Sequence, residues 1–109
     1  TALLCRPVEA NLQAMYTQAH DAGVTVVALY ISPFKGYPLW SAGQQATVDS
    51  VDAWIGATAT DVDHRVNIYT PLEDPSRPDY MLAAYDADAT HLTTAGYAVV
   101  ASEACEAVD

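Results

Sequence analysis

Val24-Thr25-Val26-Val27-Ala28-Leu29-Tyr30-Ile31 is an almost unbroken run of β-branched and apolar residues with the length of one strand. Runs of this kind are typical of parallel strands that are covered on both faces. Such a strand needs a neighbour on each side, and the only other convincing strand is predicted at about residues 66–70. Two strands would leave an edge and apolar surface exposed, so we expect the chain to dock onto further sheet.

A helix is predicted before this run, over residues 7–22. Pro7 suits its first turn, and Gly23 suits its C-terminal exit. Its apolar residues recur at spacings of three and four and should form one buried stripe: Val8, Leu12, Met15, Tyr16 and Ala19.

Two further helices are predicted after the run. Ser41 and Gln44 fit a capping box at the start of the first, which should end near Gly56 or Ala59. Its expected buried stripe is Val48, Val51, Trp54 and Ile55. Thr93 or Thr94 can cap the last helix. The residues of that helix expected to pack inward are Tyr97, Val100, Ala101 and Ala104. The pattern as a whole indicates an α/β fold.

Composition limits the partners. The chain has 109 residues, a net charge of −10 and only four Lys plus Arg, which argues against nucleic acid or an anionic membrane. No stretch is apolar enough to predict a membrane span or a signal peptide. Cys5 and Cys105 should lie roughly 17 Å apart on opposite edges, too far for a bond between them, although either could pair with a cysteine elsewhere. The compartment therefore stays open.

An acid followed three residues later by a histidine occurs twice, as Asp88/His91 and as Asp61/His64. In an open α/β sheet, ligands bind outside the carboxyl ends of the strands, in loops that leave a strand and enter a helix. Asp88 and His91 lie in such a loop. Asp61 and His64 lie between a helix and a strand, at the opposite edge, in a short return whose charges should face solvent. Asp86 is expected to support the loop of the first pair, and the alternative is that it replaces Asp88 as the acid that orients His91.

The residues around that pair resemble a family. Asp-x-x-His-Leu-x-x-x-Gly-Tyr-x-x-x-Ala, read from Asp88 to Ala101, is similar to the last conserved block of SGNH (GDSL-type) ester hydrolases. The order of the predicted elements also resembles the C-terminal half of that family. The resemblance implies that residues 1–109 are the C-terminal part of a single domain, a flavodoxin-like three-layer α/β/α parallel sheet of which about two strands and three helices are present.

The resemblance also implies a carboxylic ester hydrolase of the esterase, lipase or acetylesterase type, without a cofactor. A serine hydroxyl needs an imidazole to accept its proton, and a carboxylate on the other ring nitrogen fixes the imidazole tautomer. His91 and Asp88 match these catalytic roles. Nothing resembles the family's Gly-Asp-Ser, glycine or Gly-x-Asn-Asp blocks, and Ser32 is the least poor local nucleophile. The serine and the oxyanion hole are expected on an N-terminal segment or a companion chain, so this chain alone is predicted to be inactive.

An aromatic loop leaves the central strand at the same edge and contains Phe34, Tyr37 and Trp40. These side chains could bind substrate, or the loop could be a turn whose aromatic rings cover the core, and the sequence favours neither. Two other functions stay open for the chain as a whole. It could be a non-catalytic α/β binding or assembly module, or a metal-dependent hydrolase that uses Asp86, Asp88 and His91.

Overall fold

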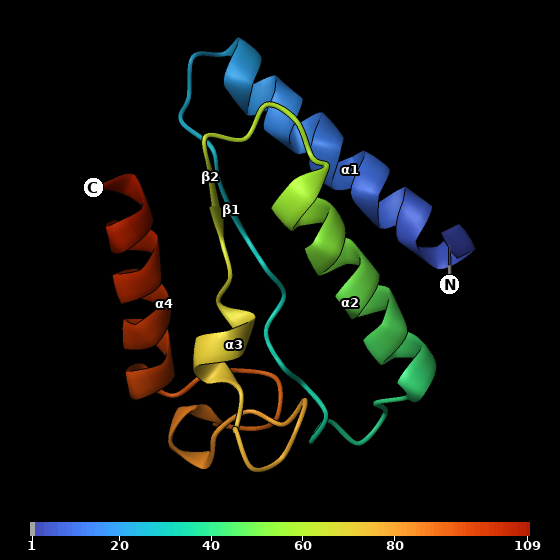
Figure 1. The fold of residues 1–109 in the computed structure, drawn as a ribbon, viewed down its shortest axis with the longest axis vertical. Helices are drawn as coiled ribbons and strands as arrows, with labels where there is room; N and C mark the ends of the chain where they lie inside the picture. The colour runs from blue at the N-terminus through green and yellow to red at the C-terminus, as the bar shows by residue number, and fades with distance from the viewer. Residues whose placement is uncertain (1) are drawn as a thin grey trace.

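A computed structural model describes residues 2–109, with side chains from residue 6 onward. Its helices and strands are, in order, α1 (Ala2–Asp21), β1 (Val27–Leu29), α2 (Ala42–Ala57), β2 (His64–Val66), α3 (Tyr69–Leu72), the 3₁₀ turn η1 (Ala83–Tyr85) and α4 (Thr94–Val108). The described residues thus form a mixed α/β fold with a two-stranded parallel sheet. Figure 1 shows the strands in the middle, with α1 and α2 on one side and α4 on the other.

The central strand is shorter than its apolar run predicts. Val27–Leu29 pairs with His64–Val66, and a bond from the Tyr30 N–H to the Val66 carbonyl at 3.0 Å extends the ladder. Carboxylate side chains accept hydrogen bonds from backbone N–H groups near both ends of the run. Asp63 accepts from the Val26 N–H at 2.7 Å, and Asp52 accepts from the Ile31 N–H at 2.8 Å. Regular pairing therefore stops where side chains replace a strand partner.

The second strand ends earlier than predicted. The sequence places it at residues 66–70, whereas β2 ends at Val66 and α3 begins at Tyr69. The cause is Asn67, whose Oδ1 accepts from the backbone N–H of Tyr69 at 2.9 Å and of Thr70 at 3.1 Å. A side chain that bonds to nearby backbone in this way competes with the strand ladder and turns the chain into the helix.

Helix α1 begins at Ala2, five residues before the predicted start, so Pro7 lies within it. The predicted apolar stripe is only partly buried. Leu12 and Tyr16 pack against the core, and the Tyr16 ring stacks on that of Trp54 with centroids 6.2 Å apart. Val8 and Met15 are 39% and 63% exposed, because nothing among the described residues covers that part of the stripe.

The predicted hydroxyl caps of α2 and α4 are confirmed, whereas the return bond from the Gln44 side chain that would complete a capping box is not seen among the described residues. The Ser41 Oγ accepts from the Gln44 N–H at 3.1 Å at the start of α2, and Thr93 Oγ1 accepts from the Gly96 N–H at 3.2 Å at the start of α4. The core side of α2 is also as expected, with Val51 and Ile55 each 1% exposed.

The predicted inward face of α4 is partly wrong. Tyr97 is 54% exposed and Ala101 is also exposed, whereas Val99, Val100 and Ala107 pack against the core. The reason is Gly96, which is buried. A β-carbon on Gly96 would lie 2.9 Å from the Tyr85 carbonyl oxygen, so this glycine sets the side of α4 that faces inward.

The return between α2 and β2 is not simply solvated. Asp61 accepts from the Thr17 hydroxyl at 2.9 Å and lies 3.7 Å from the His20 ring. Arg65 donates to the Ile55 carbonyl at 2.6 Å and also to that of Ala59. The expectation that these charges face solvent is confirmed for Asp63 and Arg65, which are exposed, although both also bond to backbone groups. Asp61 is only partly exposed, because it bonds to Thr17 near the end of α1.

One edge of β1 has no strand beside it in the part of the chain that the structure describes. The Val26 carbonyl and the Tyr30 N–H face β2, so the alternating backbone groups of Val27 and Leu29 face the other edge. Apolar side chains around this edge are exposed: Val24 by 56%, Leu29 by 37% and Ile31 by 38%. The exposed apolar edge agrees with the pattern of the sequence, and docking onto further sheet stays a prediction.

Two remaining sequence expectations concern the termini and the membrane. Cys105 is exposed with a free thiol, whereas the side chain of Cys5 lies outside those described. Within residues 2–109, no helix combines the length and hydropathy that crossing a membrane requires.

Candidate active site

The acid and histidine of the predicted pair are in direct contact. Asp88 Oδ2 lies 2.8 Å from His91 Nδ1, and Asp88 Oδ1 accepts from the backbone N–H of His91 at 2.6 Å and of Thr90 at 3.1 Å. When Nδ1 carries the proton, it donates to Asp88 and leaves the Nε2 lone pair available as a base. Nε2 has no hydrogen-bond partner among the described residues.

The loop that holds this pair is closed on itself. The Ala87 N–H donates to the His91 carbonyl at 3.0 Å, and the Thr93 N–H donates to the Tyr85 carbonyl at 2.9 Å. Asp86 Oδ1 accepts from the Ala89 N–H at 2.6 Å, where Ala89 adopts a φ of 67°. Asp86 thus ties down the turn between the catalytic candidates, in the supporting position expected from the sequence.

Hydrogen bonding holds the pKa of Asp88 well below its ordinary range, at about 2. The backbone N–H of His91 contributes most, followed by the His91 side chain and the Thr90 N–H. The carboxylate is therefore ionised throughout the neutral range and orients the imidazole. The pair is open to solvent, with the His91 side chain 71% and the Asp88 side chain 56% exposed.

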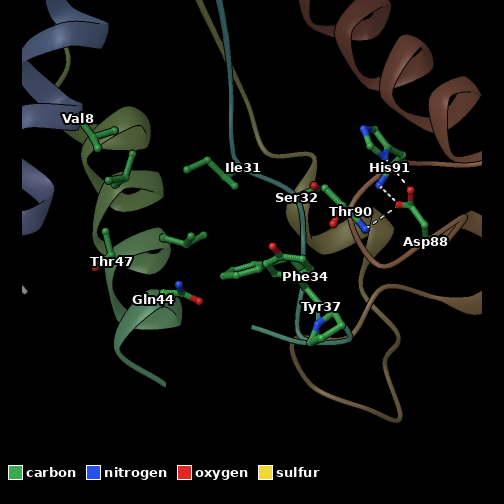
Figure 2. Close-up of a pocket in the computed structure, with 13 residues that line it drawn as sticks. Val8, Ile31, Ser32, Phe34, Tyr37, Gln44, Thr47, Asp88, Thr90 and His91 are labelled. Carbon is green, nitrogen blue, oxygen red and sulfur yellow. Dashed lines mark hydrogen bonds and ion pairs between the residues drawn. The ribbon is translucent and has the colours of Figure 1, made fainter. Parts of the chain in front are cut away.

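The pair lies at one end of a cavity of about 960 Å³. Its polar lining residues are Ser32, Gln44, Thr47, Asp88, Thr90 and His91. Its apolar lining residues are Val8, Ile31, Phe34, Tyr37, Pro38, Val48 and Val51. In Figure 2, Asp88, Thr90 and His91 lie on one side and Val8, Gln44 and Thr47 on the other, with Ile31, Ser32 and Phe34 between them. The cavity therefore extends from the acid–histidine loop, across the residues that follow β1, to α2.

The three predicted substrate-binding aromatics separate into two groups. Phe34 and Tyr37 line the cavity with the acid–histidine pair. Trp40 does not line it, because its Nε1 donates to Gln45 at 3.0 Å and the Lys35 ammonium lies 4.9 Å from its ring. Two rings of the aromatic loop therefore line the cavity and the third holds the loop to α2, and substrate binding by Phe34 and Tyr37 stays a prediction.

A polar network anchors the base of that loop. Gln45, which is 6% exposed, also donates to the Tyr69 hydroxyl at 3.0 Å, and this hydroxyl donates to Asp79 at 2.6 Å. Burial and the Asp79 carboxylate raise the pKa of Tyr69. The network joins α2, α3 and the proline-rich loop behind the cavity. The sequence carried no signal for it, because its members are far apart in the chain.

Sequence reasoning assigned Val48 and Val51 only to the core, and it missed Gln44, Thr47 and Thr90. Their position could have been found from topology. Helix α2 follows the loop after β1, so its first turns lie at the carboxyl edge, the edge at which ligands bind in such sheets. Ser32, which directly follows this strand region, lines the same cavity as His91.

The second Asp-x-x-His sequence has a structural role. Asp61 bonds to Thr17, and His64 is the first residue of β2, at the opposite edge from the cavity. Within the described part of the chain, no three His, Cys, Asp or Glu side chains gather in the manner of a metal site. Asp86, one of the three residues of the metal alternative, accepts from the Ala89 N–H.

No protein-family model matches the chain, and no curated protein matches its sequence.

Proposed function

We propose that the chain supplies the histidine and the acid of a Ser-His-Asp ester hydrolase of SGNH type. One observation carries the proposal, which is the 2.8 Å contact between His91 Nδ1 and Asp88 at the end of a cavity, with Nε2 unoccupied. In the proposed mechanism, Nε2 takes the proton of a serine hydroxyl as the serine attacks the ester carbonyl, then returns a proton to the leaving alcohol. Asp88 stabilises the imidazolium between these steps.

The serine is proposed to come from an N-terminal segment or a companion chain. Ser41 caps α2, and the Ser76 hydroxyl donates to Asp74 at 2.7 Å. Ser32 lines the cavity but is followed by Pro33, not by the glycine-flanked turn that exposes a nucleophile in hydrolases of related design. The side-chain N–H of Asn67, the group that would serve as an oxyanion donor, donates to the Thr70 hydroxyl at 3.0 Å at the start of α3. Each donor of that kind contributes about 10² to 10³ in rate.

Crossover handedness supports a further strand beside β1. About 98% of crossovers between parallel strands are right-handed. Helix α2 connects β1 to β2, and α1 packs against α2 on the same side of the strands (Figure 1). If α1 connects a preceding parallel strand to β1, that crossover is also right-handed only when the preceding strand lies at the edge of β1 away from β2. That is the open edge, where Leu29 and Ile31 are exposed.

The proposed arrangement of the complete domain follows from this strand. With the added strand, β1 becomes internal to the sheet and its apolar run gains the second neighbour that its composition requires. Helices α1 and α2 would cover one face, and α4 the other, in a flavodoxin-like order of layers. The partner segment would then bring its own strand end, and with it a serine, to the edge that holds His91.

A serine-directed fluorophosphonate tests the proposal. The partner is first identified as the coding sequence upstream of residue 1 or as a polypeptide that co-purifies with the chain. In the assembly, the probe should label a serine on the partner, and His91→Ala should abolish labelling. His64→Ala is the matched control, since it alters the histidine of the other Asp-x-x-His sequence, and it should leave labelling intact.

Three outcomes would contradict the proposal. Labelling of Ser32 itself, lost in Ser32→Ala, would show that the chain carries its own nucleophile. Appreciable hydrolysis of an aryl acetate by the purified 109-residue chain, abolished by His91→Ala, would remove the need for a partner. Unchanged function of the assembly after His91→Ala would instead favour a non-catalytic module.

A further inference from the structure

The cavity beside the acid–histidine pair has a polar end, and most of the remaining lining is apolar. Asp88, His91, Thr90 and Ser32 supply its polar atoms where the reacting carbonyl would lie (Figure 2). Further along, most of the lining is hydrocarbon, and Gln44 and Thr47 are the polar residues on the far side (Figure 2). Phe34 is half-buried in the loop after β1, and Val48 and Val51 extend the wall along α2. A molecule that fills this cavity therefore meets hydrogen-bonding groups at one end and apolar side chains over most of its length.

The described lining of the cavity carries negative charge without a lysine or arginine to balance it. Among the described residues that line the cavity, Asp88 is the one carboxylate, and no lysine or arginine is present. The Lys35 ammonium lies over the rings of Trp40, at 4.9 Å, and Tyr80, at 5.5 Å, outside the lining. An anionic ligand would leave water without gaining a cation and would approach a carboxylate in a chain of net charge −10.

We propose that this cavity binds the hydrocarbon part of an uncharged ester, a chain or a ring, and selects against carboxylates and polyhydroxylated groups. This inference rests on the proposed function, because it takes His91 and Ser32 as the end where the ester group lies. The hydrocarbon could belong to the acyl side or to the alcohol side of the ester. Both present the same chemistry to Phe34 and Val48, and the probes below separate them.

The test is direct binding to the 109-residue chain, both alone at concentrations where it is monomeric and in the assembly with its partner, followed by backbone amide NMR shifts. Methyl hexanoate probes the acyl side and hexyl acetate the alcohol side, and at least one should perturb Phe34 and Val48. Going from methyl acetate to methyl hexanoate, each added methylene should strengthen binding by up to about fourfold. Hexanoate ion should bind at least about tenfold more weakly than methyl hexanoate. Glucose 6-acetate, an ester that keeps four free hydroxyl groups, should not perturb the apolar wall.

Paired variants keep the test decisive. Phe34→Ala should weaken methyl hexanoate binding several-fold, whereas Leu39→Ala, in the same loop but 69% exposed and outside the cavity, should leave it unchanged. Gln44→Lys places a cation on the rim in the exposed first turn of α2 and should improve hexanoate binding. Gln18→Lys adds the same charge on α1 outside this cavity and should have no effect.

Equal binding of methyl acetate and methyl hexanoate, or shifts confined to residues outside the cavity, would overturn the inference. So would hexanoate binding as tight as that of its methyl ester. These outcomes are separate from failure of the enzyme proposal, because no turnover is measured. Apolar binding without phosphonate labelling of the assembly would contradict the proposed hydrolase and support the hydrocarbon-binding cavity. Labelling without a preference for apolar ligands would support the hydrolase and contradict the hydrocarbon-binding cavity.

Discussion

At the scale of single residues, the candidate site is a local construction. Asp88 receives two backbone N–H groups and one imidazole nitrogen from the three residues that follow it. This explains why the spacing of acid and histidine could be interpreted from the sequence alone. The wall of the cavity could not be interpreted in this way, because Phe34, Val48 and Thr90 come from three separate segments whose meeting depends on the fold.

The first prediction concerns the titration of Asp88. Its pKa in the folded chain is lowered to about 2 from 3.8, so the stability that its ionised form contributes is complete above pH 3.8 and is lost as the pH falls toward 2. In His91→Ala, the backbone N–H of residue 91 remains, so the Asp88 pKa should rise only partly. Carboxyl-detected NMR measures both values. A return of the pKa to 3.8 in this variant would contradict the dominance of the backbone bond.

A second prediction concerns Asp52, which is 7% exposed and accepts from the Ile31 N–H. Burial raises its pKa to about 6, the Ile31 N–H opposes this shift, and the Asp49 charge adds to it. Because the folded pKa is raised, the contribution of Asp52 to stability is present below pH 3.8 and declines as the pH rises through 6.

Asp52→Asn keeps an oxygen acceptor for the Ile31 N–H but cannot ionise. The free energy of unfolding of this variant should equal that of the parent near pH 4 and exceed it by about 1 to 2 kcal/mol at pH 7.5. Urea denaturation at the two pH values measures the difference. Asp52→Ala removes the acceptor and should be less stable than Asp52→Asn at both. A stability difference that does not change with pH would refute the assignment.

At the scale of helices and strands, sequence signals fixed the starts of α2 and α4 well, because one hydroxyl cap sets each start locally. They failed for the strand ends and for the inward face of α4. Strand pairing depends on the partner that a segment meets, and here Asn67 diverts the chain into α3 before the predicted end of β2. The face of α4 depends on the close approach of Gly96 to Tyr85, which periodicity does not encode.

The third prediction tests that approach. Gly96→Ala should destabilise the chain by about 1 to 3 kcal/mol, because its β-carbon would meet the Tyr85 carbonyl at 2.9 Å and Leu92 at 3.0 Å. It should also shift the amide resonances of His91, which precedes α4 in the same loop. Gly43→Ala is the matched control in the first turn of α2, where the nearest atom would be 3.9 Å away. It should stabilise the chain by about 0.5 to 1 kcal/mol. A Gly96→Ala variant more stable than Gly43→Ala would contradict the close packing of Gly96 on Tyr85.

At the scale of the whole molecule, the sequence predicted the most informative feature, which is an apolar strand with too few neighbours. Val24, Leu29 and Ile31 are exposed at the unpaired edge, and Met15 of α1 is exposed as well. The composition of residues 24–31 could predict that part of this strand would lack a covering partner, because a run of this kind is usually buried on both faces and the chain offers only one other strand. It could not predict which edge, because that depends on the side on which α1 and α2 pack.

The fourth prediction follows from the open edge. The isolated chain should self-associate as its concentration rises, and Leu29→Lys should reduce association, since a lysine on an edge strand opposes pairing. Leu39→Lys, which is exposed in a loop, should not reduce it. Both changes bring the net charge of −10 closer to zero, so charge alone would promote association. Sedimentation velocity measures the result, and equal effects of the two variants would exclude the edge as the contact.

The ring of hydrogen bonds from Tyr85 to Thr93 makes the acid–imidazole geometry transferable. The turn is closed by its own backbone and by Asp86, and it needs only a helix start after it and a small residue at the position of Gly96. Nine residues could therefore be grafted onto the carboxyl edge of an unrelated parallel sheet and keep their arrangement. Evolution or an engineer could in this way install a ready-made proton acceptor without rebuilding the scaffold beneath it.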